Sequence, residues 1–266
     1  MKTLSPRSFA TVTDLFHRVS GIRLGPQKQA LVAGRLQKLA EESGERDLDR
    51  YVERLSSGHA PAEEMTRLVD RLTTNETYFF REPQHFDDLA RRADAAPAGE
   101  YTVWSAASSS GEEAYSIAMV LAETRGSTHW QVIGTDLSTA VVDAARRGLY
   151  PLDRARLTPP PLLKRHCLKG TGEYAGQLLV SRELRERVSF RVANLMQPLP
   201  KDLPAFDVIF LRNVLIYFET DAKAAIVRRV IERLKPGGVL YTGHAESLSM
   251  LGLPLRALAP AVHVAA

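Results

Sequence analysis

The sequence predicts an α/β fold, a doubly wound parallel sheet, preceded by an all-helical segment. From about residue 100 onward, short apolar runs rich in β-prone residues alternate with helix-sized amphipathic runs, as in parallel sheets with crossover helices. Before that point, apolar residues recur only at helical spacing. With 266 residues, of which 44% are apolar and 25% charged, the chain is long enough to bury a sizeable core.

The first part of the chain, residues 1–73, is expected to contain only helices. Apolar residues repeat at helical spacing in four stretches, which are Phe9 to Val19, Leu31 to Leu39, Leu48 to Leu55 and Met65 to Leu72. Gly21 and the Gly25-Pro26 pair interrupt the pattern, and Pro26 suits the first turn of a new helix.

The second part is expected to supply the parallel sheet. Its predicted strands are Tyr101–Ala106, Trp130–Thr135, Val188–Val192, Phe206–Leu211 and Val239–Thr242. Its predicted helices are Glu112–Glu123, Thr139–Arg147 and Asp221–Leu234, the last ending at a Lys-Pro-Gly-Gly sequence. The stretch at about 151–187 breaks the alternation. We interpret it as an insertion, partly helical and then a small antiparallel β piece, with a long surface loop as the alternative.

Composition excludes several classes of protein. The single cysteine, Cys167, rules out an intramolecular disulfide and a cysteine-based zinc site, and no metal is expected. One cysteine fits a reducing cytoplasm. No apolar stretch approaches the ~20 residues of a membrane span, so membrane insertion is not expected. The formal charge of +4 is a mild basic excess, compatible with an acidic partner or with a solvated surface.

Polar residues follow three of the predicted strands, where open α/β sheets bind ligands. The first set is Ser105–Glu113, whose small residues allow close approach to a helix N-terminus. Asp136 follows the second strand and could accept hydrogen bonds from ribose hydroxyls or cap the next helix. Asn213 follows the fourth strand, where an amide could read an adenine edge or simply form a turn. The glycine-rich signatures of dinucleotide binders and phosphate-binding loops are missing from the sequence.

A further segment, Leu72–Pro83, joins the helical part to the sheet. Its three successive aromatics, Tyr78 to Phe80, are interpreted as core residues at the junction. Asn75, Thr77 and Arg81 flank them, and Arg81 could pair bidentately with a carboxylate or be an ordinary surface arginine.

Taken together, these motifs resemble the chemotaxis-receptor methyltransferases, the CheR family. The motifs that follow the family's order and spacing are TNETYFFRE, WSAASSSGEEAYSIAM, GTDLS, VANL, FDVIFLRNVLIYF, LKPGGVL and GHAESL. The resemblance covers almost the whole chain. It departs at Ser108–Ser110, where the family often has cysteine or threonine, at Ala114 in place of a proline, and at His263 in place of an aromatic residue.

The resemblance implies a Rossmann-like class I methyltransferase domain that uses S-adenosylmethionine and releases S-adenosylhomocysteine. It implies a receptor-recognition domain at 1–73, a linker at 74–85 that contributes to the cofactor site, and a methyltransferase domain at 86–266 with a β-subdomain insertion at about 151–187. The implied cofactor-binding residues are Asn75, Thr77, Arg81, Glu112, Asp136, Asn194, Leu195, Asn213 and Val214. Arg81 and Tyr217 match positions beside the transferred methyl group.

The implied acceptor is a glutamate carboxylate of a chemoreceptor. Such a carboxylate, with an unperturbed pKa of roughly 4.3, is ionised at neutral pH and needs no general base. The implied partner is the cytoplasmic helical bundle of the receptor, docked on Lys28, Arg35 and Lys38, with a receptor C-terminal peptide on the insertion as a further contact. A solvated basic face is the alternative for the three cations. Alternatives for the whole chain are a methyltransferase for nucleic acid or a small molecule, and a non-catalytic cofactor-binding module.

Overall fold

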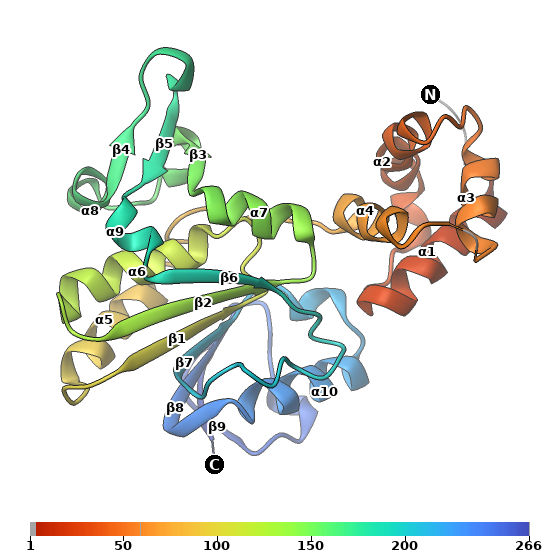
Figure 1. The fold of residues 1–266 in the computed structure, drawn as a ribbon. Coiled ribbons are helices and arrows are strands. Elements are labelled where there is room, and N and C mark those ends of the chain that lie inside the picture. The colour runs from red at the N-terminus through yellow and green to blue at the C-terminus, as the bar shows by residue number, and fades with distance from the viewer. Residues whose placement is uncertain (1–3, 59, 266) are drawn as a thin grey trace.

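The computed structural model describes residues 4–58 and 60–265. It consists of a helical bundle at the N-terminal end and a larger α/β part that carries a small second sheet (Figure 1). Residues 1–3, 59 and 266, which belong to the predicted segments 1–73 and 86–266, lie outside the described residues. Within the described residues, no helix has the length and apolar character that a membrane crossing requires.

The N-terminal part, which we call the front bundle, is helical as predicted. It contains α1 (Pro6–Ser20), α2 (Gln29–Glu42), α3 (Leu48–Ser56) and α4 (Ala62–Leu72), with a 3-10 turn at Pro26–Lys28. The apolar face of each helix turns inward, and Phe16, Leu36 and Leu68 are fully buried in a core of their own. The Ser5 side chain accepts a hydrogen bond from the Ser8 N–H at the start of α1, and Gly21 ends the helix in a left-handed conformation with a φ of 74°.

The main sheet has seven strands in the order β6-β2-β1-β7-β8-β10-β9. Neighbouring strands from β6 to β8 pair in parallel, and their bounds are β1 Tyr101–Ala106, β2 Trp130–Asp136, β6 Val188–Val192, β7 Phe206–Leu211 and β8 Leu234–Thr242. The doubly wound parallel sheet is therefore confirmed. The antiparallel edge formed by β9 (Leu255–Ala259) and β10 (Val262–Ala265) was not predicted.

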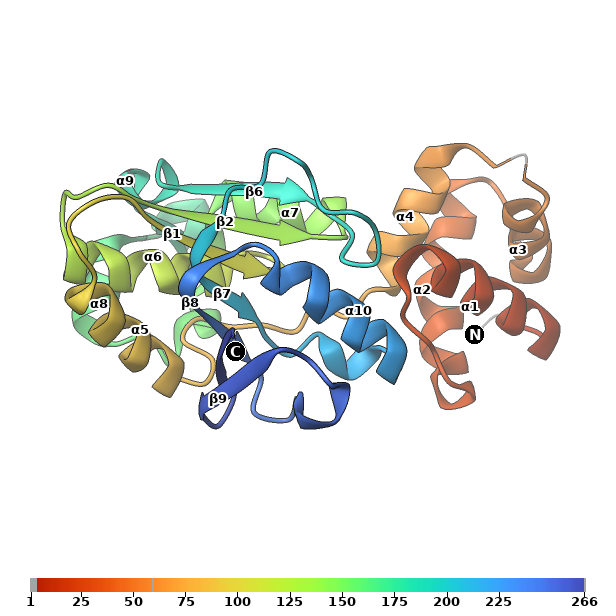
Figure 2. The ribbon, with the colours of Figure 1, turned by 90° about the horizontal axis from the view of Figure 1, so that it is seen from below.

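Helices cover both faces of this sheet (Figure 2). The helices are α5 Gln84–Ala95, α6 Glu112–Arg125, α7 Thr139–Arg147 and α10 Thr220–Ile231. Successive residues of β1 point to opposite faces, so Val103 enters the core beneath α5, α6 and α7 while Trp104 enters the core beneath α10. Helix α5 was not predicted. Helix α10 ends three residues before the predicted Leu234, because the Lys-Pro-Gly-Gly sequence belongs to the start of β8.

The insertion folds as a small subdomain and not as a long surface loop. Its three-stranded antiparallel sheet has the order β3-β5-β4, with bounds β3 Leu149–Pro151, β4 Cys167–Lys169 and β5 Gln177–Val180. It also contains 3-10 turns at Leu152–Ala155 and Gly172–Tyr174, and the short helices α8 (Pro160–His166) and α9 (Arg182–Arg185). The sheet begins at Leu149, before the predicted limit of 151, and the strand β4 was not anticipated.

Candidate active site

A cavity lies where the front bundle, the linker and the carboxyl ends of β1, β2 and β7 meet. Strands β1 and β7 are neighbours although β2 and β6 lie between them in the sequence, so the chain reverses its direction of winding here. Ligands of open α/β sheets bind at such a switch point. The front bundle contributes lining residues between Ser20 and Leu31, and the linker contributes residues between Leu72 and Arg81.

Asp136 lies at the end of β2, lines the cavity and is buried. Its two carboxylate oxygens each accept one backbone hydrogen bond, from Ser109 N at 2.8 Å and from Ser138 N at 3.0 Å. Burial raises the pKa of this carboxyl, and these backbone N–H groups oppose the shift. Each oxygen keeps a lone pair free, so the carboxylate can still accept from two neighbouring ligand hydroxyls. The helix-capping alternative is not realised, since Ser138 caps α7.

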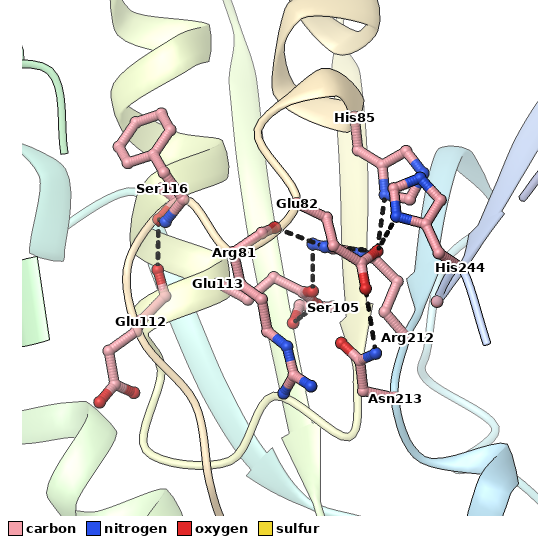
Figure 3. A network of polar contacts seen from close by, with 12 residues as sticks. Arg81, Glu82, His85, Ser105, Glu112, Glu113, Ser116, Arg212, Asn213 and His244 are labelled. Atoms are coloured by element: carbon pink, nitrogen blue, oxygen red, sulfur yellow. Dashed lines mark hydrogen bonds and ion pairs between the residues drawn. The ribbon is translucent and has the colours of Figure 1, made fainter. Parts of the chain in front are cut away.

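The glutamate that faces the cavity is Glu113 and not Glu112. Glu113 lines the cavity, where it accepts hydrogen bonds from Ser105 Oγ at 2.7 Å and from Arg212 Nη1 at 3.0 Å. The carboxylate of Glu112 lies apart from that group in Figure 3, with Ser110 Oγ 2.7 Å away and Arg154 3.5 Å away. Glu112 begins α6 and its side chain is 1% exposed. Among the described residues, Glu113 and not Glu112 therefore lines the cavity.

Arg212, directly after β7, lines the cavity and joins two carboxylates (Figure 3). Its buried guanidinium lies 3.0 Å from an oxygen of Glu82 and 3.0 Å from an oxygen of Glu113. Burial raises the pKa of Glu113, and Arg212 opposes the shift. For Glu82 the attraction of Arg212, with hydrogen bonds from Asn213 and Arg212, outweighs burial and lowers the pKa. Within the described residues Glu113 lines the cavity and Glu82 does not, so Glu113 is the carboxylate of this group that a cationic part of a ligand can reach.

Glu82 also lies close to two histidines, His85 and His244. The Nδ1 atoms of His85 and His244 are 3.6 Å and 3.5 Å from Glu82 Oε2, and the two rings are tilted by 40° with their centroids 4.9 Å apart. The three side chains could in principle hold a metal ion. However, the same oxygen of Glu82 already pairs with Arg212, and a guanidinium 3.0 Å away opposes the binding of a cation there.

The linker residues named from the sequence are brought to the cavity together. Asn75, Thr77 and Arg81 all line it. Arg81 is half-buried and donates from Nη1 to the carbonyl oxygen of Glu76 at 3.1 Å, with its guanidinium carbon 5.8 Å from the centre of the Tyr78 ring. A carboxylate held in a fork uses two of the five guanidinium N–H groups, so the observed bond leaves this capacity.

Two further segments supply the remaining predicted residues. Asn194 and Leu195 follow β6, whereas Asn213, Val214 and Tyr217 follow β7, and all five line the cavity. Asn213 has a φ of 57°, an unusual left-handed conformation for a residue other than glycine. Tyr217 ends a 3-10 turn, Leu215–Tyr217, and is half-buried.

The three predicted docking cations differ in their surroundings. Lys28 is exposed and lines the cavity, and Lys38 is exposed on α2. Arg35 instead turns toward the end of α4, where Nη1 donates to the carbonyl oxygens of Leu72 at 2.8 Å and Thr73 at 3.1 Å. Burial lowers its pKa. Arg35 therefore donates to the carbonyl oxygens at the end of α4, whereas Lys28 and Lys38 are the exposed members of the three.

The cavity suits S-adenosylmethionine in its chemistry. Asp136 has free acceptor capacity for ribose hydroxyls, and Glu113 offers a carboxylate for the ammonium group. Arg81 offers donors for the carboxylate, which is bonded to the same α-carbon as the ammonium group. Leu195, Val214 and Phe218 supply an apolar lining of the kind that receives an adenine ring.

Comparison with known proteins agrees with this geometry. Residues 7–73 match the family model for the all-alpha domain of CheR methyltransferases, and residues 75–257 match the model for their S-adenosylmethionine-binding domain. The chain is 39% identical to the chemotaxis protein methyltransferase of Salmonella typhimurium over 93% of this chain and 86% of that one. The Escherichia coli protein of the same name is also 39% identical, over 93% of this chain and 87% of that one. Chemotaxis protein methyltransferase 2 of Pseudomonas aeruginosa is 39% identical, over 90% and 86%.

These matches span both the front bundle and the sheet, and the relatives are covered over most of their own length. The protein is a methyltransferase with S-adenosylmethionine as its cofactor. The chain belongs to the CheR methyltransferase family.

Proposed function

We propose that this enzyme transfers the methyl group of S-adenosylmethionine to glutamate carboxylates of chemoreceptors, forming methyl esters during chemotaxis-type adaptation. The observation that carries the proposal is that Arg81 and Tyr217, from separate segments, line one cavity together with the exposed cation Lys28. Arg23 also lines the cavity but is paired with Glu219 at 2.8 Å. The positive charge of Lys28 favours the approach of an anionic acceptor. The names of the relatives, chemotaxis protein methyltransferases, favour a receptor as the protein that carries it.

The proposed reaction requires positioning more than acid–base chemistry. S-adenosylmethionine supplies a methyl group on a sulfonium, which a carboxylate can attack directly in line. Because a glutamate carboxylate has an unperturbed pKa of roughly 4.3, it is ionised at neutral pH without a general base. The protein must therefore hold the acceptor, orient it and exclude water. We assign the orientation of the acceptor carboxylate to the Tyr217 hydroxyl. Arg81 would hold the cofactor in place and tune the local electrostatic field.

The cofactor contacts that we propose follow the lining of the cavity. Asp136 would accept from the ribose hydroxyls, the pairs Asn194-Leu195 and Asn213-Val214 would border the adenosine, and Asn75 and Thr77 would close the linker side. Glu113 takes the place first assigned to Glu112. In this proposal residues 74–85 act as a linker between a recognition domain, 1–73, and a methyltransferase domain, 86–266.

Two surfaces are proposed for the receptor. The cytoplasmic helical bundle would dock on the front bundle through Lys28 and Lys38, both of which are exposed. A receptor C-terminal peptide would add as a strand to the small sheet of the insertion, where β3 and β4 are the outer strands. Leu168 on β4 and Tyr174 in the adjoining turn are 60% and 48% exposed, and they offer apolar contact for such a peptide.

The test is transfer of labelled methyl from S-adenosylmethionine to receptor-containing membranes, followed by treatment with alkali. Release of the label as volatile methanol is the expected result, because carboxyl methyl esters hydrolyse in alkali. Label that stays on protein or on nucleic acid would identify another acceptor atom and overturn the proposal. Cofactor binding without any transfer to a matched receptor would indicate a non-catalytic module.

The role of Tyr217 is tested separately with Tyr217→Phe, which removes only the hydroxyl. We expect kcat/KM for receptor methylation to fall about tenfold or more, with the affinity for S-adenosylhomocysteine unchanged. Full kcat/KM in this variant would show that the hydroxyl does not orient the acceptor.

A further inference from the structure

We propose that Glu246 is a positioning residue, whose carboxylate holds the loop after β7 in the shape that the active site requires. Glu246 lies in the turn after β8 and is 6% exposed. Its Oε2 accepts from Asn213 N at 2.7 Å and from Gly243 N at 2.7 Å. Its Oε1 accepts from Leu215 N at 2.6 Å and from Ile216 N at 3.3 Å. One side chain thus receives four backbone N–H groups from two loops.

A carboxylate is suited to this place because it only accepts hydrogen bonds, with two oxygens and about four lone pairs. Strands β7 and β8 are parallel neighbours that end side by side, with Leu211 opposite Thr242. The loops that leave them have no strand to pair with, so their N–H groups need another acceptor. Gly243 allows this contact, because a Cβ there would lie 2.8 Å from Glu246 Oε2 and 2.5 Å from Asn213 Nδ2.

The loop that Glu246 holds carries three of the cavity-lining residues, Asn213, Val214 and Tyr217. Asn213 has a φ of 57°, a conformation that costs free energy unless its surroundings hold it. Glu246 binds the backbone N–H of Asn213, and Glu82 accepts from its side-chain amide at 3.2 Å. Glu246 does not line the cavity in the described part of the chain, so it acts through this loop and not on a ligand.

The inference rests on the proposed function where it concerns Tyr217, since a displaced loop would move the hydroxyl away from the acceptor carboxylate. A displacement of about 1 Å can lower the rate of a positioned reaction by about 10²-fold. The structural half of the inference, that the carboxylate anchors the loop, does not depend on which acceptor the enzyme methylates. The two halves therefore need separate readouts.

The first readout is amide hydrogen exchange in Glu246→Gln, measured on the full chain without substrate. Glutamine keeps one acceptor oxygen and replaces the other with a donor, so about half of the four N–H groups lose their acceptor. We expect faster exchange in the peptide that spans residues 213–217, with exchange in α6 unchanged. Unchanged exchange at 213–217 in a folded variant would overturn the anchoring role, whatever the acceptor proves to be.

The second readout is methyl transfer. We expect Glu246→Gln to lower kcat about 10- to 100-fold. In the double variant with Tyr217→Phe, the two losses should not multiply, because both act through the same hydroxyl. Losses that multiply fully would show that Glu246 does not act through Tyr217. An absence of receptor methylation in the parent enzyme would instead contradict the proposed function and leave the exchange result standing.

Glu64→Gln is a matched control. Glu64 is also a glutamate with 6% exposure, but it lies in the front bundle and accepts from Arg54 at 2.9 Å. Its replacement should leave kcat and the exchange of 213–217 unchanged even if it lowers the melting temperature. If Glu246→Gln does not fold, Glu246→Asp keeps the charge and both oxygens but shortens the reach. Parent-like kcat and exchange in Glu246→Asp would overturn the inference.

Discussion

The side-chain amide of Asn194 donates a hydrogen bond to the carbonyl oxygen of Val19, 2.7 Å away, although 175 positions separate the two residues. Val19 lies in the last turn of α1, so the bond joins the front bundle to the sheet. The oxygen of the same amide accepts from Met196 N at 2.9 Å. Because Asn194 also lines the cavity, it belongs both to the contact between the front bundle and the sheet and to the candidate cofactor site.

Replacement of Asn194 with aspartate is expected to weaken the contact between the front bundle and the sheet. Aspartate keeps an acceptor for Met196 N but places a carboxylate oxygen against the Val19 carbonyl, where the amide donates. Loss of this partly buried bond should lower the free energy that holds the front bundle against the sheet by about 1 kcal/mol. Limited proteolysis in the linker 73–83 should become faster, whereas Val19→Ala, which keeps the carbonyl, should resemble the parent. Equal cleavage rates in Asn194→Asp and the parent would contradict the prediction.

Glu113 and Glu112 are expected to differ in their effect on the cofactor. Glu113→Gln removes a charge from the cavity wall, so the Kd for S-adenosylhomocysteine, which keeps the ammonium group, should rise about tenfold. Glu112 contacts Ser110 and Arg154 outside the cavity, so Glu112→Gln should change that Kd less than about threefold. Isothermal titration calorimetry compares the two. A larger rise in Kd in Glu112→Gln than in Glu113→Gln would show that Glu112, the residue named from the sequence, binds the cofactor.

Two basic residues of α2 are expected to have different roles, with Arg35 stabilising the fold and Lys38 contacting the receptor. Arg35→Ala leaves the carbonyl oxygens of Leu72 and Thr73 without a donor, and should lower the free energy of unfolding by about 1–3 kcal/mol. Lys38→Glu should leave the melting temperature nearly unchanged but raise KM for the receptor. Thermal melts and receptor-methylation kinetics test both variants. A receptor KM that is unaffected by Lys38→Glu would remove Lys38 from the docking surface.

His85 is expected to make the protein acid-sensitive. Burial, and then the charge of Arg212, lowers its pKa from 6.5 to about 4, whereas Glu82 and Asp88 act in the opposite direction and His244 lowers it further. Between these values the unfolded chain binds a proton that the folded chain does not, so the stability contributed by neutral His85 is complete above pH 6.5 and is lost toward pH 4. The slope from one such group is at most about 1.4 kcal/mol per pH unit.

His85→Phe tests this because phenylalanine keeps an aromatic ring beside Tyr241 and His244 but cannot titrate. Neither ring nitrogen of His85 has a hydrogen-bond partner within the described residues, so the substitution leaves no partner unsatisfied. The melting temperature of the variant should fall less than that of the parent between pH 7 and pH 5. Parallel falls in the two proteins would show that His85 does not cause the acid sensitivity.

The sheet could be predicted from the sequence because buried parallel strands are apolar almost throughout. Phe206–Leu211 is such a run, and its bounds were predicted as observed. The edge strand β9 was missed because four of its five residues are exposed, so the sequence LRALA has neither an apolar run nor a clear alternation. Helix α5 was missed because its inward residues, chiefly Phe86, Leu89 and Ala93, begin immediately after the linker aromatics.

The site could be predicted where a residue's position at a strand end decides its direction, as for Asp136. Two adjacent glutamates at a helix start differ by about 100° in direction, so the sequence alone did not reveal which one faces the cavity. Gly111 precedes α6 and has a φ of 96°, and a Cβ at this position would lie 2.8 Å from the Cβ of Ala145. Glycine therefore allows α6 to begin in the orientation that turns Glu113 toward the cavity. The role of Arg35 was hidden for another reason, because its partners at Leu72 and Thr73 are brought near only by the packing of α2 against α4.

The cavity wall is shared between the front bundle and the sheet, yet the front bundle has its own hydrophobic core. A small separation of the two parts would therefore remove one wall of the site while leaving every helix and strand folded. Such partial openings require less free energy than global unfolding. On warming, the enzyme should therefore lose its activity at a lower temperature than the one at which its helices and strands unfold.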